Sequence, residues 1–139
     1  MKKVIKTTQK INAPIDKLWA NISKASGVNT WLPVITACSL EGNGEGAKRV
    51  CKSEQGDLSE TIVKVDHANK VFQYSVDKQP FFPIADILGT MSLKDNMGST
   101  QLNWDLEFNI SDESQFPMVK EAIEGMYAAG AMGLESISK

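Results

Sequence analysis

The stretch TQLNWDLEFNI, at Thr100–Ile110, alternates polar and apolar residues from its second residue onward. Leu102, Trp104, Leu106 and Phe108 fall on one side of this pattern, and polar or acidic residues fall on the other. A period of two is typical of a β-strand that has one buried face and one face in water. The stretch therefore predicts an antiparallel strand whose apolar face packs into a core.

The period changes immediately afterwards, because residues from about Gln115 to Ser138 repeat with helical spacing. Asp112 and Ser114 offer capping side chains, and Pro117 is tolerated in a first helical turn. Two adjacent stripes of apolar or small residues cover more than half of the predicted helix, which is wider than one sheet face usually demands. The first stripe comprises Val119, Ile123, Met126, Gly130, Leu134 and Ile137, and the second comprises Met118, Ala122, Gly125, Ala129, Met132 and Gly133.

At the start of the chain, the pattern of Val4–Ile11 predicts a strand. Two short helical segments follow it, and the first begins at Pro14 while the second ends at Pro33. The chain then continues with further β segments separated by turns. These segments are Val34–Leu40, Ala47–Lys52, Leu58–Val65, Val71–Val76 and Ile84–Leu93. The order predicts an α+β fold, in which a curved antiparallel sheet of about seven strands wraps around one long C-terminal helix.

The composition is that of an ordinary globular chain, with 139 residues of which 42% are hydrophobic and 23% charged, and it predicts one domain over residues 1–139. Arg49 is the only arginine and the net charge is −2, so nucleic-acid binding is not expected. No apolar run approaches the ~18 residues of a membrane span, and no signal-peptide core follows Met1–Lys3. We therefore expect a cytoplasmic monomer or homodimer without an integral membrane segment.

The chain has few residues that bind metals. His67 is the single histidine, and two cysteines make a poor zinc site, so neither a metal nor an organic cofactor is expected. Cys38 and Cys51 flank the glycine-rich turn Glu41–Gly46, and a hairpin closing near Gly44 would place them nearly opposite each other. That proximity would permit a disulfide, but a cytoplasmic location argues for free thiols.

Among the ionisable residues, Glu60 is the strongest candidate for a catalytic or ligand-binding role. The alternation of its segment groups it with Leu58 and Ile62, and a carboxylate that faces an apolar pocket could act as an acid, a base or a ligand anchor. In the alternative pattern Ser59 and Thr61 face inward and Glu60 lies in water. The alternation does not decide between these two orientations.

Several short motifs stand in a characteristic order along the chain. They are Ile11–Pro14 followed by Leu18-Trp19, Trp31–Pro33, Leu40–Arg49, Ser59–Thr61, Phe72–Val76, Thr100–Phe108 and Gly125–Leu134. In this order the chain resembles the START-like helix-grip superfamily (SRPBCC), which includes the birch-pollen allergen, and within it the polyketide cyclase/dehydrase group. Ile35–Leu40 is also similar to a strand of the plant abscisic-acid receptors, which belong to the same superfamily.

The resemblance implies a deep pocket between the sheet and the long helix that binds small apolar or amphipathic molecules, lipids among them. Where the receptor branch has a lysine that pairs with a ligand carboxylate, this chain has Thr36, so an acid of that kind is not expected. The large aromatic residues Trp31 and Phe82 are expected to contribute to the walls. The positions that the resemblance places in the pocket are Thr36, Leu58, Glu60, Ile62, Tyr74, Val76, Ile84, Ile87, Gly89, Trp104, Leu106, Met118, Ala122, Met126, Ala129 and Gly133.

Three functions remain open on this basis. The first is binding of an apolar or amphipathic small molecule in the cavity. The second is catalysis as a polyketide cyclase or dehydratase, with Glu60 or a tyrosine as the acid or base. The third is a protein-interaction module whose partner surface is the cavity rim, including Phe81 and Phe82. The scarcity of arginine and histidine weighs against catalysis, but whether the protein is an enzyme and which ligand it binds stay open.

Overall fold

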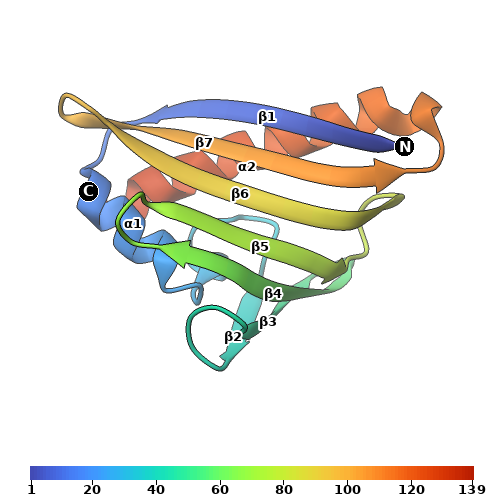
Figure 1. The fold of residues 1–139 in the computed structure, drawn as a ribbon, viewed down its shortest axis with the longest axis horizontal. Helices are drawn as coiled ribbons and strands as arrows, with labels where there is room; N and C mark the ends of the chain where they lie inside the picture. Colours follow the sequence, from blue (N-terminus) through green and yellow to red (C-terminus); the bar gives the residue numbers. More distant parts are fainter.

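All seven strands of the protein form one antiparallel sheet in the order β1-β7-β6-β5-β4-β3-β2. The computed structural model describes residues 1–139, and α2 lies along one face of the curved sheet (Figure 1). This arrangement confirms the predicted α+β helix-grip fold. The elements are β1 (Lys2–Ile11), α1 (Ile15–Ser23), the 3-10 turn η1 (Val28–Thr30), β2 (Ala37–Glu41), β3 (Lys48–Ser53), β4 (Gly56–Asp66), β5 (Val71–Lys78), β6 (Ile84–Asn96), β7 (Ser99–Ile110), the 3-10 turn η2 (Glu113–Gln115) and α2 (Phe116–Ile137).

Strand β7 has the alternation that its sequence predicts. Leu102, Trp104, Leu106 and Phe108 are buried on the face toward α2, while the residues between them are partly exposed. β7 pairs with β6 on one side and with β1 on the other, where Ile5 lies opposite Leu106. Each inward residue of β7 therefore lies between residues of two neighbouring strands.

Helix α1 begins directly after Pro14, whose backbone is extended. Leu18, Trp19 and Ile22 form its buried stripe, as their helical spacing predicts. The helix ends at Ser23, and Gly27 takes the left-handed conformation, with φ of 74°, just before η1. The chain after α1 consequently turns back across the open side of the sheet, and this segment carries Trp31.

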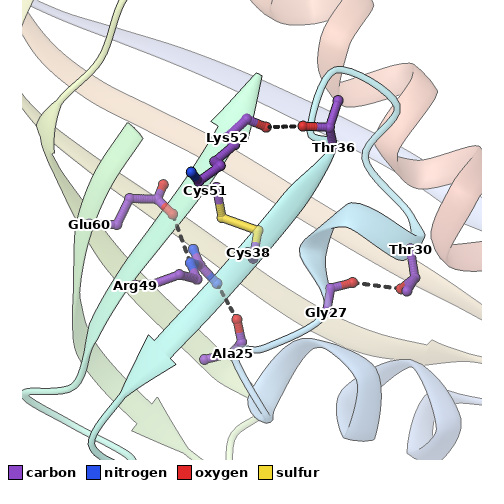
Figure 2. The surroundings of a disulfide bond; sticks show 9 residues. All are labelled: Ala25, Gly27, Thr30, Thr36, Cys38, Arg49, Cys51, Lys52 and Glu60. Atoms are coloured by element: carbon purple, nitrogen blue, oxygen red, sulfur yellow. Dashed lines mark hydrogen bonds and ion pairs between the residues drawn. A yellow bond between two sulfur atoms is a disulfide. The ribbon is translucent and has the colours of Figure 1, made fainter. Parts of the chain in front are cut away.

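Strands β2 and β3 are joined by a disulfide between Cys38 and Cys51, which face each other in the β2–β3 register (Figure 2). The expectation of free thiols is therefore wrong for this structure. The physical reason is the register itself, since it brings the two Cα atoms to 4.1 Å, within the close spacing of a non-hydrogen-bonded antiparallel pair. The disulfide ties the edge strand β2 to the sheet beside Arg49.

Neither α-helix combines the length with the apolar character that a membrane crossing requires.

Candidate functional site

Two adjoining cavities lie between the sheet and the helices. The α1 cavity, of about 40 Å³, lies between α1, the η1 segment and strands β3–β7. The α2 cavity, of about 80 Å³, lies between strands β4–β7, α2 and the loop that precedes β6. Most of the residues around both cavities are hydrophobic, as is typical of sites for small molecules. The residues shared by the two linings are Leu32, Ile35, Leu58, Glu60, Tyr74 and Trp104.

A buried ion pair forms part of the wall. Arg49 and Glu60 lie opposite each other on β3 and β4, and Arg49 Nε donates to Glu60 Oε1 at 2.7 Å (Figure 2). Arg49 Nη1 also donates to the carbonyl of Ala25 at 2.8 Å, and the guanidinium lies 5.4 Å from the ring centre of Tyr74. Both charged side chains are thus held in fixed positions at the α1 cavity, in a pair whose net charge is zero.

A second polar group sits where the two cavities meet. Trp104 Nε1 donates to the hydroxyl of Tyr74 at 2.9 Å, and that hydroxyl lies 3.4 Å from the hydroxyl of Tyr127. The rings of Trp104 and Tyr127 are stacked, with centroids 3.7 Å apart and planes within 6°. These three aromatic residues from β5, β7 and α2 therefore hold one another in place. The hydroxyl groups of Tyr74 and Tyr127 lie within a mostly apolar interior.

Burial raises the pKa of Tyr74 above the ordinary tyrosine value, and the neighbouring Glu60 carboxylate adds to this rise. Burial raises the pKa of Tyr127 still further, with the proximity of Tyr74 as the second cause. Both residues are consequently neutral near pH 7. The pair can donate or accept hydrogen bonds there, but it cannot supply a phenolate base.

Glycines make room for the aromatic residues of the site. A Cβ atom at Gly89 would collide with the ring of Tyr74, which lies opposite Gly89 across β5 and β6. A Cβ atom at Gly133 of α2 would collide with the backbone carbonyl of Trp31. These two close approaches seat Tyr74 on the sheet and fix the Trp31 segment against the helix.

The loop before β6 covers one side of the α2 cavity. The side chain of Gln79 accepts from the backbone N–H groups of Phe81 and Phe82 at 2.7 and 2.9 Å, and it donates to the carbonyl of Phe82 at 2.7 Å. Phe81 and Phe82 are half-buried and both line the cavity. The loop is therefore ordered by its own hydrogen bonds, with two phenyl rings at the rim.

Residues 2–138 match the family described as polyketide cyclase/dehydrase and lipid transport. The match spans almost the whole chain and agrees with the sheet, helix and cavity described above. The protein belongs to the polyketide cyclase/dehydrase and lipid transport family. No curated protein matches the sequence.

Solved structures share the fold of this family member at low sequence identity. The ginseng major latex-like protein 151 from Panax ginseng has a TM-score of 0.84 at 16% identity, over 99% of this chain and 97% of the other. The protein XoxI from Bacillus cereus has 0.82 at 19% identity, over 97% and 94%. Ara h 8.0201 has 0.75 at 16% identity, over 98% and 99%. At these identities the likeness establishes the fold alone.

Most of the residues that were expected in the pocket lie around the two cavities. Glu60 faces inward with Leu58, which settles the orientation that the alternation left open. The expected residues that line one or both cavities are Trp31, Leu58, Glu60, Tyr74, Val76, Phe82, Ile84, Ile87, Trp104, Leu106 and Met126.

Other expected positions on the sheet side lie outside the cavities. Thr36 is exposed before β2, where its hydroxyl donates to the carbonyl of Lys52 at 3.2 Å. Ile62 is buried in the core and lines neither cavity. Gly89 also lines neither cavity, since the ring of Tyr74 covers it.

The orientation of α2 accounts for the remaining differences. Its first apolar stripe faces the sheet, and Tyr127 stands near the middle of that face. Most of the second stripe faces away from the sheet, so Met118 and Ala122 are exposed, and Ala129 lines neither cavity. Gly133 packs on the Trp31 backbone instead of lining a void. The pocket positions expected on the second stripe are therefore not at the cavity.

Sequence reasoning expected Trp31 in the wall but missed Arg49, Leu32 and Ile35. The signal for Arg49 was available, since a hairpin register that pairs Cys38 with Cys51 places Arg49 on the same face of β3 as Cys51. The contribution of Leu32 and Ile35 depends on how the η1 segment folds back, and no local pattern encodes that path.

Proposed function

We infer that this protein binds a small apolar or amphipathic molecule in the α1 and α2 cavities. The observation that carries this inference is a partly unfilled interior, lined by hydrophobic side chains and a few fixed polar groups. Well-packed cores leave few voids larger than a water molecule, so adjoining cavities of this kind favour a ligand site over simple core packing. Membership of a family described by lipid transport and polyketide chemistry supports the same function.

The test is a titration with toluene, followed by tryptophan fluorescence, since Trp31 and Trp104 both line the cavities. We expect a saturable change in the native protein. Ile87→Phe, which enlarges a side chain lining the α2 cavity, should abolish it. Leu88→Phe is the matched control, because Leu88 is the next residue of β6 and lines neither cavity. A response that survives Ile87→Phe, or no saturable response at all, would contradict the proposal.

Native mass spectrometry of protein purified from its own host gives an independent test. A co-purified small molecule in the native protein, absent from Ile87→Phe, would support binding in the α2 cavity. A co-purified molecule that is equally abundant in both proteins would place its site elsewhere on the chain.

Catalysis on a polyketide-like substrate is the second candidate function, and the buried tyrosine pair favours it. A neutral hydroxyl inside an apolar cavity is suited to donating to a substrate carbonyl as charge develops there. Glu60 is less suited to act as a free base, because Arg49 already donates to its carboxylate. If a substrate is found, Tyr127→Phe should lower turnover more than affinity, whereas equal affinity and turnover in both proteins would exclude this role.

A further inference from the structure

Two polar atoms of residues that line the α1 cavity make no hydrogen bond within the chain, and the indole nitrogen of Trp31 is the buried one of the two. Trp31 lines the α1 cavity and is 6% exposed, and its indole N–H donates to nothing. Glu60 is also 6% exposed, and Oε1 is the only one of its two carboxylate oxygens that accepts a hydrogen bond from the chain. Buried polar atoms are nearly always paired, so the unused indole N–H of Trp31, at the same cavity as an unused carboxylate oxygen, favours a ligand with a polar group at this place.

The other polar groups of the walls are already engaged. Arg49 donates to Glu60 and to the carbonyl of Ala25. Tyr74 accepts from Trp104 and its hydroxyl lies beside that of Tyr127. The groups that make no hydrogen bond at all are therefore one donor, the indole N–H of Trp31, and one acceptor, Glu60 Oε2, and the ion pair beside them is already neutral. A hydroxyl group satisfies both needs, because it donates one hydrogen bond and accepts others.

The volumes of the two cavities limit the size of the ligand. The α1 cavity, at about 40 Å³, exceeds the roughly 15 Å³ that one water needs, so it accommodates a hydroxyl group beside Trp31 and Glu60. The α2 cavity, at about 80 Å³, is the more apolar of the two and adjoins the first along six shared residues. An apolar cavity of about 150 Å³ holds one benzene ring in another protein. Space of this order fits a single ring and excludes a long acyl chain or a fused polycyclic skeleton.

We propose that the ligand is a neutral, single-ring compound with one hydroxyl group, such as a phenol. This inference rests on the proposed function and narrows its ligand class. The ring occupies the α2 cavity, the hydroxyl donates to Glu60 Oε2, and its oxygen accepts from Trp31 Nε1. A carboxylate is disfavoured because it would place a second negative charge beside Glu60, and a plain hydrocarbon leaves both polar atoms unpaired.

The test compares p-cresol, p-xylene and p-toluate, which share a ring and a methyl group and differ only in the second substituent. Affinities are measured by isothermal titration calorimetry on the native protein. We expect p-cresol to bind at least about tenfold more tightly than p-xylene, which is the gain expected for a hydrogen bond to a charged group, and p-toluate to bind most weakly. Equal affinities for p-cresol and p-xylene would overturn the proposal and leave the proposed function intact, whereas binding of none of the three would count against both.

Two further measurements identify the atoms. The indole ¹H–¹⁵N resonance of Trp31 should move downfield with p-cresol and far less with p-xylene, and an unmoved resonance at saturation would exclude the contact with Trp31. Trp31→Phe should reduce the preference for p-cresol about fivefold while p-xylene still binds, which shows that the cavity has formed. Tighter binding of a long-chain alcohol such as dodecanol than of p-cresol would overturn the size limit.

Discussion

The β1 half of the sheet and the β4 half bury their residues in different ways. On the β1 side, Ile5, Leu102 and Phe108 of the sheet belong to the same buried core as Val119 and Leu134 of α2, and all five are at most 1% exposed and line neither cavity. On the β4 side the interior contains an ion pair, hydroxyl groups, a disulfide and two cavities. The difference teaches that one half of this small core is closely packed, while the other half leaves the space in which we propose that a ligand binds.

The sharpest test compares two leucines on the same strand. Leu102→Ala should cost about 5 kcal/mol in the free energy of unfolding, because Leu102 is fully enclosed and its surroundings cannot collapse. Leu106→Ala should cost only about 2 kcal/mol, because Leu106 already borders the α2 cavity and loses fewer contacts. Urea unfolding followed by circular dichroism measures both. Equal costs at the two positions would remove the distinction between the halves.

The ion pair gives the next largest effect. Glu60→Leu should destabilise the protein by about 4 kcal/mol, since it leaves the charge of Arg49 buried without a partner. The control is the double variant Arg49→Met/Glu60→Leu, which should regain most of that loss, because well-packed hydrophobic residues replace buried ion pairs at little cost. A double variant as unstable as the single one would mean that the pair itself, rather than the unpaired charge, carries the stability.

The disulfide should contribute about 3 kcal/mol, as expected for a closed loop between cysteines 13 residues apart. Dithiothreitol should therefore lower the urea midpoint of the native protein. Dithiothreitol should not change the urea midpoint of the double variant Cys38→Ala/Cys51→Ala, because this variant lacks the disulfide and its midpoint is already lower. The control is to denature the native protein without a reductant and add iodoacetamide. Reaction of two thiols would contradict the disulfide.

The buried tyrosines predict the smallest effect, a loss of stability in alkali. The folded protein holds the phenol protons of Tyr74 and Tyr127 to a higher pH than the unfolded chain does, because burial raises both pKa values above 10.0. This contribution is therefore fully present below pH 10.0 and declines as the pH rises beyond it. Tyr127→Phe should reduce the decline by about 1 kcal/mol per pH unit, measured as urea midpoints from about pH 8 to about pH 11. Parallel pH profiles for the two proteins would exclude this effect.

The fold was largely predictable from the sequence, because its signals are local. The alternation of Thr100–Ile110 and the helical spacing after Gln115 each define an element within its own residues. The order of motifs then limits how such elements can be arranged. Element ends moved by a few residues, as at α1, because capping and positive-φ positions decide them rather than hydrophobic period.

The site was predictable only where it follows strand alternation. Val76 and Leu106 follow directly from the inner faces of β5 and β7. The rotation of α2 was not predicted, although the first stripe carries larger apolar side chains than the second, because the resemblance placed pocket positions on both stripes. The Arg49–Glu60 pair requires a register between strands, which no single segment encodes.

Strand β1 has a kinetic consequence for synthesis of the chain. Every other pair of neighbouring strands in the sheet is consecutive in sequence, but Lys2 of β1 pairs with Asn109 of β7. A nascent chain therefore carries β1 without its partner until nearly all of the sheet has emerged from the ribosome. Closing so long a loop makes docking of β1 a slow, late event. During that interval its unpaired edge is exposed to mispairing and aggregation, so chaperone demand should depend on the first ten residues more than on the cavity.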